Sequence, residues 1–275
     1  MFQNSYFKSA PELAEFIFSY GIIEYDNPLG ITFITPPNGL TGFLMRIGDE
    51  TASLKASISE GKYFAWQSNY AIGQSTLPIT WSPKGHLKYL VVFFQPTGMY
   101  QLFGKNMKNL TDTTIDLHDF LGYEVFESLK EQLDQKIAII DKCEVLNDFF
   151  LALKPKVFSI NLIDEALNLI NESDGNISVL EIEEKLNINR KTLERQFQER
   201  IGLSPKVYCQ IYRFKLLMNY LNEHPETTWA ELSNKYRFFD QAHMIRYFKK
   251  YLNVSPNNII KLNFDLYAIS YLLLL

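Results

Sequence analysis

The chain repeats one short pattern near its C-terminus, and this repeat restricts its fold more than any other feature. The run LERQFQERIGLSP, which ends at Pro205, returns fifty-one residues later as MIRYFKKYLNVSP, which ends at Pro256. In both copies an Arg stands two residues before a Phe, and Ser-Pro closes the pattern. Self-similarity at a fixed spacing is typical of a duplicated supersecondary unit. The sequence therefore predicts two copies of one small structural unit.

A capping signal precedes each copy of the pattern. Ser178 is followed by Glu181, and Thr228 by Glu231, at the spacing of a capping box. In a capping box the hydroxyl accepts a free backbone N–H of the first turn, and the carboxylate accepts the N–H of the cap residue. The sequence therefore predicts that one helix begins after Ser178 and another after Thr228.

A short turn and a second capping residue follow each of these helices. Asn189 and Asp240 have side-chain oxygens that can accept the exposed N–H groups at the start of a second helix. Along each second helix, apolar residues four apart can pack on the preceding helix, so the opposite, polar face stays exposed. Two helices arranged in this way form a helix-turn-helix, whose second helix enters the major groove of DNA.

These residues resemble a known family. From about Ile163 to Leu262 the sequence is similar to the DNA-binding domain of AraC/XylS-type transcription regulators. The resemblance implies an all-α domain of seven helices with two helix-turn-helix units that bind double-stranded DNA, and it allows a contact with RNA polymerase. The sequence departs from the family at Arg237, where a turn glycine is usual, and at Met244, where Phe is common. The signature residues are Leu232, Phe238, Asp240, Gln241, His243, Arg246, Phe248, Lys249, Lys250, Ser255 and Pro256.

The resemblance also assigns roles to the polar faces of the two second helices. Arg pairs with guanine and Gln with adenine in the major groove, whereas Lys also binds phosphate. The residues expected to read bases are Lys191, Glu194, Arg195, Gln241, His243 and Arg246. The residues expected to contact phosphates are Arg190, Lys249 and Lys250.

A long helix is predicted between the two copies. Ser204 is a good cap, and Pro205 suits the first helical position because its missing N–H is not needed there. Apolar residues at helical spacing continue to about Glu223, so roughly nineteen residues would span about 28 Å. One turn of B-DNA is about 34 Å, so two second helices joined by this strut could enter successive major grooves.

The charge distribution is uneven along the chain. The formal net charge is −4, but residues 171–262 carry 14 Lys and Arg against 11 Asp and Glu, whereas residues 1–170 carry 13 against 19. Phosphate contacts act within a Debye length of about 8–10 Å, so the local surface matters more than the total charge. A modestly basic C-terminal part is compatible with DNA binding.

The first 155 residues have a different sequence pattern, in which short runs of apolar and β-branched residues alternate with residues that favour turns. Runs of this kind are typical of a small β-barrel or sandwich. The predicted strands are Ile31–Ile34, Phe43–Ile47, Tyr63–Trp66 and Tyr89–Phe94. The predicted turns are Pro36-Pro37-Asn38-Gly39, Gly48-Asp49, Glu60-Gly61 and Ser82-Pro83-Lys84-Gly85.

Helical patterns follow Pro96, over Gly98–Gly104, Leu117–Ile140 and Lys142–Leu153. The segments PPNG, FQPTGMYQLFG and LTDTTIDLHDFLG resemble the cupin-like N-terminal domain of one branch of the same family. The expected fold class is α+β, with a cupin-like β-barrel and its helices in residues 1–155 and an all-α double helix-turn-helix domain in residues 156–275, core 163–262. In the resembling family the helices after the barrel often pair two copies, so a homodimer is one expectation. The alternative is that these helices only cover the open end of the barrel.

No catalytic or metal-binding pattern is visible in the N-terminal part. A metal-dependent cupin needs several converging ligands, but only His86 and His118 occur there, far apart in the sequence. No metal, no cofactor and no enzymatic activity are therefore expected. Aromatic residues on strands fill cores more often than they line pockets, yet they could hold a small effector. The candidate pocket residues are Tyr63, Trp66, Trp81 and Tyr89.

The remaining features favour a bacterial-type, cytoplasmic regulator. Cys143 and Cys209 are too few for a disulfide framework, and the N-terminus lacks the pattern of a secretory signal. The apolar tail 266–275 is about half as long as a membrane span, and we expect it to be a packing segment. The alternative is a metal-free, cupin-like small-molecule binding protein whose C-terminal domain contacts proteins instead of DNA. A cupin enzyme is a third, weaker alternative.

Overall fold

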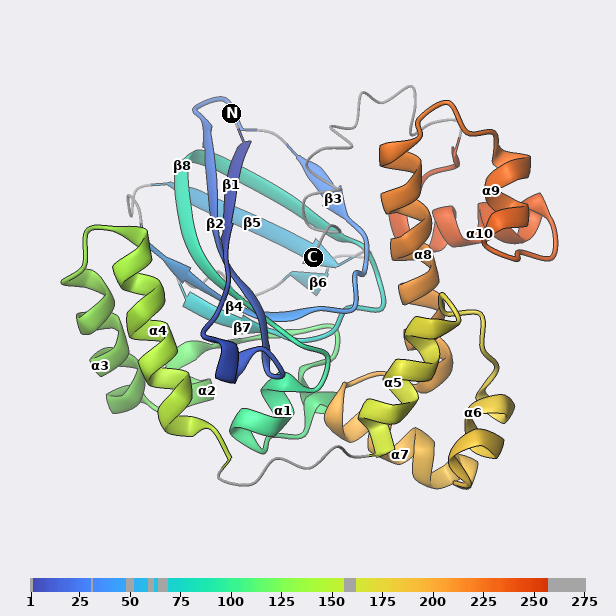
Figure 1. The fold of residues 1–275 in the computed structure, drawn as a ribbon. Helices are drawn as coiled ribbons and strands as arrows, with labels where there is room; N and C mark the ends of the chain where they lie inside the picture. Colours follow the sequence, from blue (N-terminus) through green and yellow to red (C-terminus); the bar gives the residue numbers. More distant parts are fainter. Residues whose placement is uncertain are drawn as a thin grey trace.

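The computed structural model describes residues 2–30, 32–47, 52–58, 62–63, 69–155 and 162–256. An antiparallel sheet forms the first part, several helices follow it in the chain, and an all-α part closes the described sequence (Figure 1). The coarse prediction of an α+β chain with the sheet first is confirmed.

The sheet contains nine strands in the described residues, and all the pairs between them are antiparallel. The strands are β1 (Phe2–Phe7), β2 (Ile17–Asn27), β3 (Phe33–Thr35), β4 (Thr41–Arg46), β5 (Ser53–Ile58), β6 (Lys62–Tyr63), β7 (Asn69–Ile72), β8 (Ile79–Phe94) and β9 (Thr114–Asp116).

The long strand β8 organises the sheet. Its first part pairs with β3 and β5, and its second part pairs with β2 and β4. The turn predicted at Ser82-Pro83-Lys84-Gly85 is therefore wrong, because these residues lie inside β8. Pro83 stands opposite Leu54 of β5, and Gly85 adopts a φ of 88°, which a glycine accepts without strain. Pairing of residues 82–84 with β5 and of Gly85 with β2 outweighs the local turn preference of this segment.

The described strands do not form the closed barrel that the sequence predicts. Their main path runs β1-β2-β8-β4-β7-β9, and within the described part of the chain the first and last strands of this path do not pair. The sheet is therefore open there, and the prediction of a closed β-barrel is replaced by an open antiparallel sheet. Strands β1 and β2, which the sequence analysis missed, supply one side of it.

The two faces of the sheet have different environments, because successive side chains of a strand point to opposite sides. Leu90, Val92 and Phe94 of β8 belong to a core that contains residues from the helices after the sheet, whereas Val91 and Phe93 belong to a second cluster on the other face. These helices are α1 (Gly98–Phe103), the 3₁₀ helix η2 (Met107–Leu110), α2 (Leu117–Leu121), α3 (Tyr123–Asp134) and α4 (Ile139–Leu153); the short 3₁₀ helix η1 (Pro11–Leu13) precedes β2.

The helical stretch predicted over Leu117–Ile140 is divided in the structure. Gly122 adopts a φ of 93° between α2 and α3, and residues 135–138 separate α3 from α4. Burial of Phe120 and Phe126 on the same core holds α2 and α3 in place on either side of this glycine. The periodic pattern thus predicted the helices correctly but not the break.

Six α-helices make up the described C-terminal part, and the predicted caps form. Ser178 and Thr228 each complete a capping box, while Asn189 and Asp240 accept backbone N–H groups at the starts of the second helices. The predicted seventh helix and the predicted packing segment 266–275 fall outside the described residues. The helices are α5 (Leu162–Glu172), α6 (Val179–Leu186), α7 (Arg190–Arg200), α8 (Pro205–Glu223), α9 (Trp229–Lys235) and α10 (Gln241–Leu252).

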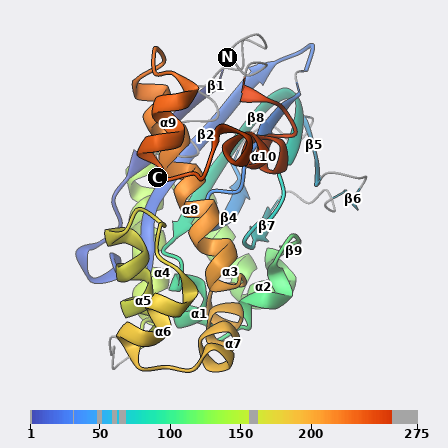
Figure 2. The same cartoon turned by 90° about the vertical axis from the view of Figure 1, so that its right-hand side faces the viewer.

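The predicted linker helix is α8, nineteen residues long, and it lies between the pairs α6–α7 and α9–α10 (Figure 2). Its apolar side enters one core that contains buried residues from both pairs, such as Phe197 of α7 and Phe248 of α10. The helix-turn-helix architecture predicted from the repeat is therefore present in both copies.

The turn between α9 and α10 contains strained backbone. Arg237, where the related family has a glycine, adopts a φ of 50° and is exposed. A side chain with a β-carbon costs about 1–2 kcal/mol in this left-handed region, although glycine loses more entropy on folding.

We expect Arg237→Gly to raise the free energy of unfolding by about 0.5–1 kcal/mol, because glycine removes the strain at this φ. Urea unfolding of the full chain measures the change. Arg237→Ala keeps the β-carbon and is the matched control, so it should bring no such gain. Equal stabilisation by alanine would show that the charge of Arg237, and not its backbone, is responsible.

Candidate nucleic-acid interface

The first candidate reading surface is the polar face of α7. Asn189 caps this helix, and Leu193 is fully buried against the core, which turns the opposite side outward. Lys191 and Arg195 are exposed, as predicted for residues that contact DNA. Both arginines of this face are paired with acids one turn further along the helix: Arg190 Nε lies 3.0 Å from Glu194 Oε1, and Arg195 Nη1 lies 3.3 Å from Glu199 Oε2.

The second candidate surface is the polar face of α10. Asp240 accepts the backbone N–H of His243 at 2.6 Å, and Met244 is fully buried, so the helix is oriented as α7 is within its own pair. Gln241, Arg246 and Lys249 are exposed. The substitution of Met for the common Phe at position 244 keeps an apolar side chain in this packing position.

His243 is less accessible than its neighbours on α10. Its ring meets Phe238 and Tyr247 edge to face, with centroids 5.5 and 5.3 Å away. Burial, together with the nearby charges of Arg213 and Arg246, lowers the pKa of His243 below its usual value. At neutral pH the ring is therefore uncharged, and it can offer a hydrogen bond but not an ion pair to DNA.

Lys250 faces α8 instead of projecting freely. Its Nζ donates to Gln210 Oε1 at 3.2 Å and to the hydroxyl of Tyr251 at 3.0 Å, and it lies 4.7 Å from the centroid of the Tyr251 ring. To reach a phosphate this side chain has to give up these contacts. Lys249, which is exposed on the same turn, is the better placed of the two predicted phosphate contacts.

Arg213 of α8 is a residue that sequence reasoning missed. Its guanidinium donates to Asn176 Oδ1 at 3.1 Å and to the Tyr247 hydroxyl at 2.6 Å. It also stacks over Phe238, 4.8 Å from the ring centroid. The loop before α6, the turn before α10 and α10 itself are thus tied to one side chain. In the sequence, only the position of Arg213 beside the apolar residues of the linker helix could have indicated this role.

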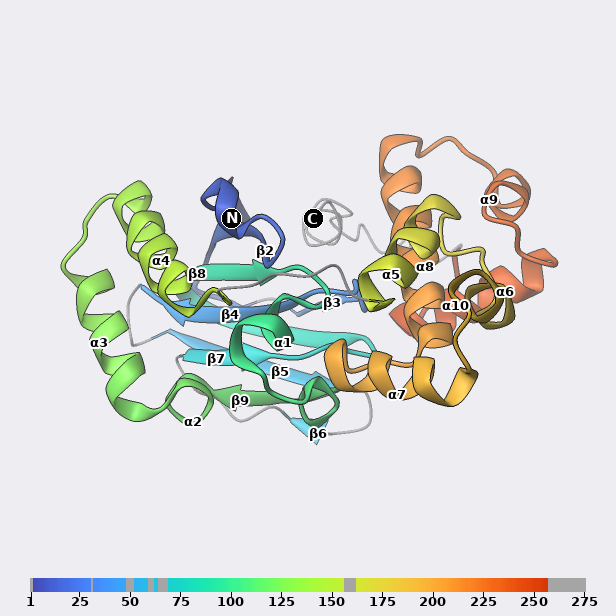
Figure 3. The ribbon, with the colours of Figure 1, turned by 60° about the horizontal axis from the view of Figure 1, so that its bottom comes forward.

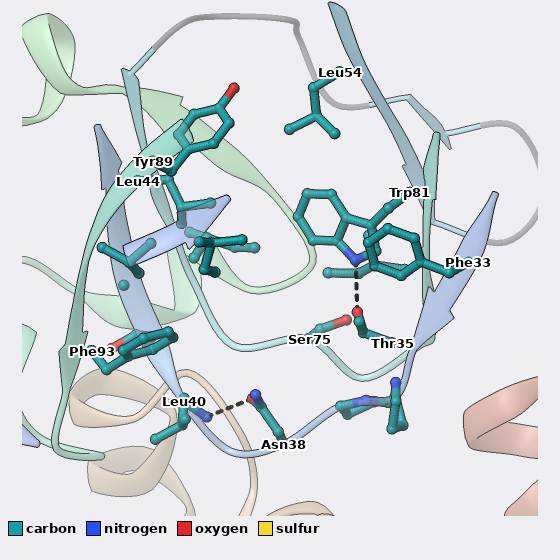
Figure 4. A pocket seen from close by; sticks show the side chains of 18 of the residues that line it. Phe33, Thr35, Asn38, Leu40, Leu44, Leu54, Ser75, Trp81, Tyr89 and Phe93 are labelled. Atoms are coloured by element: carbon teal, nitrogen blue, oxygen red, sulfur yellow. Dashed lines mark hydrogen bonds between the residues drawn. The ribbon is translucent and has the colours of Figure 1, made fainter. Parts of the chain in front are cut away.

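A cavity opens on the face of the sheet opposite the helices, between β8 and β3 (Figure 4). Trp81 and Tyr89, two of the predicted pocket residues, line it. The side chain of Tyr63 and all of Trp66 lie outside the described residues. The indole N–H of Trp81 donates to Thr35 Oγ1 at 2.7 Å, which orients the ring along one wall.

The volume of the cavity is about 130 Å³, and its described lining contains no charged side chain. An apolar cavity of about 150 Å³ can hold a molecule of the size of benzene. Further residues, which the sequence analysis did not select, complete the walls of the cavity. Those on β8 occupy alternate positions of the strand, so the alternation of inward and outward side chains could have identified them. Among the further residues are Phe33, Leu44, Leu54, Leu87 and Val91.

The two histidines of the N-terminal part lie in separate hydrogen-bonded groups. His86 Nε2 is 2.7 Å from Glu24 Oε1, whereas His118 bridges Asp116 and Glu127 at 2.7 and 2.6 Å. The hydrogen bond with Glu127 is the main cause of a raised pKa at His118. Among the described residues there is no group of three or more His, Cys, Asp or Glu that could hold a metal ion.

None of the helices in the described ranges is both long and apolar enough to cross a membrane. This finding covers α1 to α10 and leaves aside the residues after Pro256.

Two family models match parts of the chain. Residues 182–261 match a family described as a helix-turn-helix domain, and these residues include both copies of the repeated pattern. Residues 6–116 match a family described only as a domain of unknown function, DUF6597. The cupin-like resemblance of the N-terminal part therefore stays a prediction.

Two curated proteins and several solved structures are similar to the chain. The uncharacterized HTH-type transcriptional regulator YtdP of Bacillus subtilis is 25% identical over 63% of this chain and 24% of its own length. The Msm operon regulatory protein of Streptococcus mutans is 32% identical over 36% of each protein. The chain thus covers only about a quarter to about a third of these relatives. ToxT from Vibrio cholerae O395 aligns with 94% of this chain and 96% of its own, at 12% identity and a TM-score of 0.48.

Both copies of the repeated pattern, together with the caps Asn189, Thr228 and Asp240, lie within the matched helix-turn-helix region. Ser178, the cap of α6, precedes this region by four residues. Both curated relatives are named as regulators. The chain therefore carries a helix-turn-helix domain, as the duplicated pattern predicted.

Proposed function

We propose that this chain is a sequence-specific DNA-binding transcription regulator whose two helix-turn-helix units read successive major grooves. The observation that carries the proposal is that both units pack on one continuous helix, α8, and that each turns a polar face outward. An α-helix fits the major groove, and two such helices on one strut can follow the same side of a duplex.

The proposed base-reading residues are those predicted from the repeat. Arg195 and Arg246 occupy equivalent exposed positions of the two copies, and Lys191 and Gln241 lie closer to the helix starts. Glu194 is held by Arg190 in the free protein, and His243 contributes a neutral ring. Lys249 is the proposed phosphate contact of α10, and Arg190 that of α7.

In the alternative, a C-terminal part that contacts proteins, the centre of the exposed face would be depleted of charged residues. The exposed faces of α7 and α10 are instead rich in Arg, Lys and Gln. Such side chains match phosphate and base edges better than the centre of a protein interface, from which charged residues are depleted. This composition favours DNA as the partner.

For the N-terminal part we propose a cupin-like sensor within residues 1–155, joined to a DNA-binding domain in residues 156–275. Its apolar cavity suits a small uncharged effector, because the described lining offers no charged group to neutralise an ionic ligand. A regulatory role, not an enzymatic one, is proposed for the chain, in the bacterial cytoplasm where the chromosome lies. A contact with RNA polymerase belongs to the same proposal.

We also propose that the chain forms a homodimer through α3 and α4. These helices lie on the side of the sheet away from the C-terminal helices (Figure 1). Several large apolar side chains of this region are exposed, among them Val125 at 46%, Ile137 at 96% and Ile140 at 56%. Pairing of two copies would remove this apolar surface from water.

Replacing Arg246 by Ala should weaken binding to the preferred DNA site by about 1–3 kcal/mol and relax selectivity at one or two base pairs. Fragments retained from total genomic DNA in a mobility shift supply the preferred site. Lys249→Ala is the matched control. It should weaken binding to all sequences alike and reduce the slope of the logarithm of the binding constant against the logarithm of salt concentration by about one, the value for one phosphate contact. Equal loss on preferred and mixed DNA in Arg246→Ala would assign Arg246 to phosphate.

An uncharged aromatic compound should bind the cavity and stabilise the protein. Toluene at one hundred times its dissociation constant would add about 2.7 kcal/mol to the free energy of unfolding, whereas benzoate, which has the same ring but a charge, should add little. Thermal-shift measurements test the pair. Leu87→Trp, which fills the cavity, should abolish the effect of toluene, and equal stabilisation by benzoate would reveal a cation in the site.

The full chain should scatter light as a dimer, and Ile140→Asp should convert it to a monomer by placing a charge in the apolar contact. Asp is compatible with this position because it lies in the first turn of α4, where a negative charge is favourable. Glu124→Asp on α3 is a control that keeps the charge. A wild-type monomer at high micromolar concentration would contradict the proposed dimer.

A further inference from the structure

The C-terminal end of α7 lies against α1 and η2 of the N-terminal part (Figure 3). Thr111, just after η2, donates from Oγ1 to the carbonyl oxygen of Gly202 at 2.6 Å. The hydroxyl of Tyr100 in α1 donates to Glu199 Oε1 at 3.2 Å, and the guanidinium of Arg200 lies 5.3 Å from the centroid of the Tyr100 ring. We call these contacts the α7 dock.

Gly202 permits this close approach. A β-carbon at this position would lie 2.8 Å from Thr111 Oγ1 and 2.9 Å from the carbonyl oxygen of Met107, and the φ of 94° is itself unsuited to other residues. The equivalent residue of the second copy, fifty-one positions later, is Asn253. Its side chain could not be accommodated at such a distance, so the repeat has a docking residue in its first copy only.

Glu199 connects the dock with the reading face of α7. One carboxylate oxygen accepts the Tyr100 hydroxyl, and the other lies 3.3 Å from Nη1 of Arg195. A carboxylate anchored from a second element restricts the side chain that pairs with it more than a mobile one does, because fewer rotamers of both groups remain accessible. The N-terminal part thereby contacts a predicted base-reading arginine through a single intermediate.

The repeat shows that this acid is specific to the docked copy. Arg195 and Arg246 are equivalent, but the position equivalent to Glu199 is Lys250, which faces Gln210 of α8. In the second copy Arg246 therefore has a cation one turn further along the helix, where Arg195 has an anchored carboxylate. The two copies therefore share the arginine that is predicted to read bases, but they differ in the residue one turn further along the helix that could position this arginine.

We propose that Glu199 is a positioning residue through which the N-terminal domain orients Arg195 for base recognition, an inference that rests on the proposed DNA-binding function. The anchored carboxylate holds the guanidinium in one orientation and offsets its charge. It thereby reduces the attraction of Arg195 to phosphates of any sequence. Docking of α7 on α1 and η2 increases the selectivity of the first reading helix at the expense of its general affinity for DNA.

The test measures the affinity of the full chain for a preferred fragment, selected from total genomic DNA, and for a mixed-sequence duplex of the same length. Tyr100→Phe keeps the ring beneath Arg200 but removes the hydroxyl that holds Glu199. The ratio of preferred to mixed affinity should fall roughly threefold to tenfold, as expected for the net loss of one ordinary hydrogen bond. In Glu199→Gln the ratio should fall as well, while the affinity for mixed DNA rises.

The double variant separates positioning from packing. If Tyr100 acts through Glu199, adding Tyr100→Phe to Glu199→Gln should change the ratio no further. Tyr123→Phe, on the remote helix α3, is the matched control and should leave the ratio unchanged. Circular dichroism checks that each variant is folded.

Two results would overturn the inference. One is an unchanged ratio in Tyr100→Phe and Glu199→Gln, and the other is an effect of Tyr100→Phe that persists in full when Glu199 is already Gln. Failure of the unaltered chain to bind any DNA would instead overturn the proposed function, and this inference with it.

Discussion

Burial of the apolar side of α8 is the interaction on which the two helix-turn-helix units depend. Each unit is too small to enclose its own apolar residues, and both place them against this one helix, where Ile211, Phe214 and Leu217 are fully buried. A repeated unit of this kind becomes stable only when a neighbour covers its exposed apolar face. The helix therefore stabilises each pair and determines the spacing between their polar faces at the same time.

The two units, although equivalent in sequence, differ in their surroundings. The first touches the N-terminal part through the α7 dock, and a chain of hydrogen bonds leads from this dock toward the cavity. The side-chain amide of Gln74, which follows the cavity-lining residue Gly73, donates to the carbonyl of Gly39, and the backbone carbonyl of Gln74 accepts the N–H of Asp112, the neighbour of Thr111. The cavity wall and the α7 dock are thus connected through neighbouring residues.

Acidic partners moderate the basic surface of α7. Glu194 and Glu199 each lie within 3.3 Å of an arginine on the same helix, whereas Lys249 of α10 is exposed. Exposed pairs of this kind add little stability, since solvent screens them. Their effect on recognition is larger, because a carboxylate that offsets the charge of an arginine weakens its attraction to phosphates of any sequence, whereas a base with a good acceptor still binds the guanidinium.

Much of the fold was predictable where neighbouring residues carry the information. The capping boxes at Ser178 and Thr228 and the start of α8 at Pro205 follow from residues within one turn of one another. The polar faces of α7 and α10 were likewise visible in the periodicity. By contrast, the turn expected around Pro83 is part of β8, because β5 pairs with residues 82–84 and β2 pairs with the strand from Gly85 onward.

The sequence by itself determined the duplicated helix-turn-helix units, since helix caps and helical periodicity are local properties of the chain. Tertiary structure alone decided that the described sheet is open, that Lys250 faces α8, and that Glu199 joins Tyr100 to Arg195. These features depend on residues that lie forty to about a hundred positions apart. Their contacts arise from the packing of whole elements, and no local pattern records which distant side chain that packing will bring within reach.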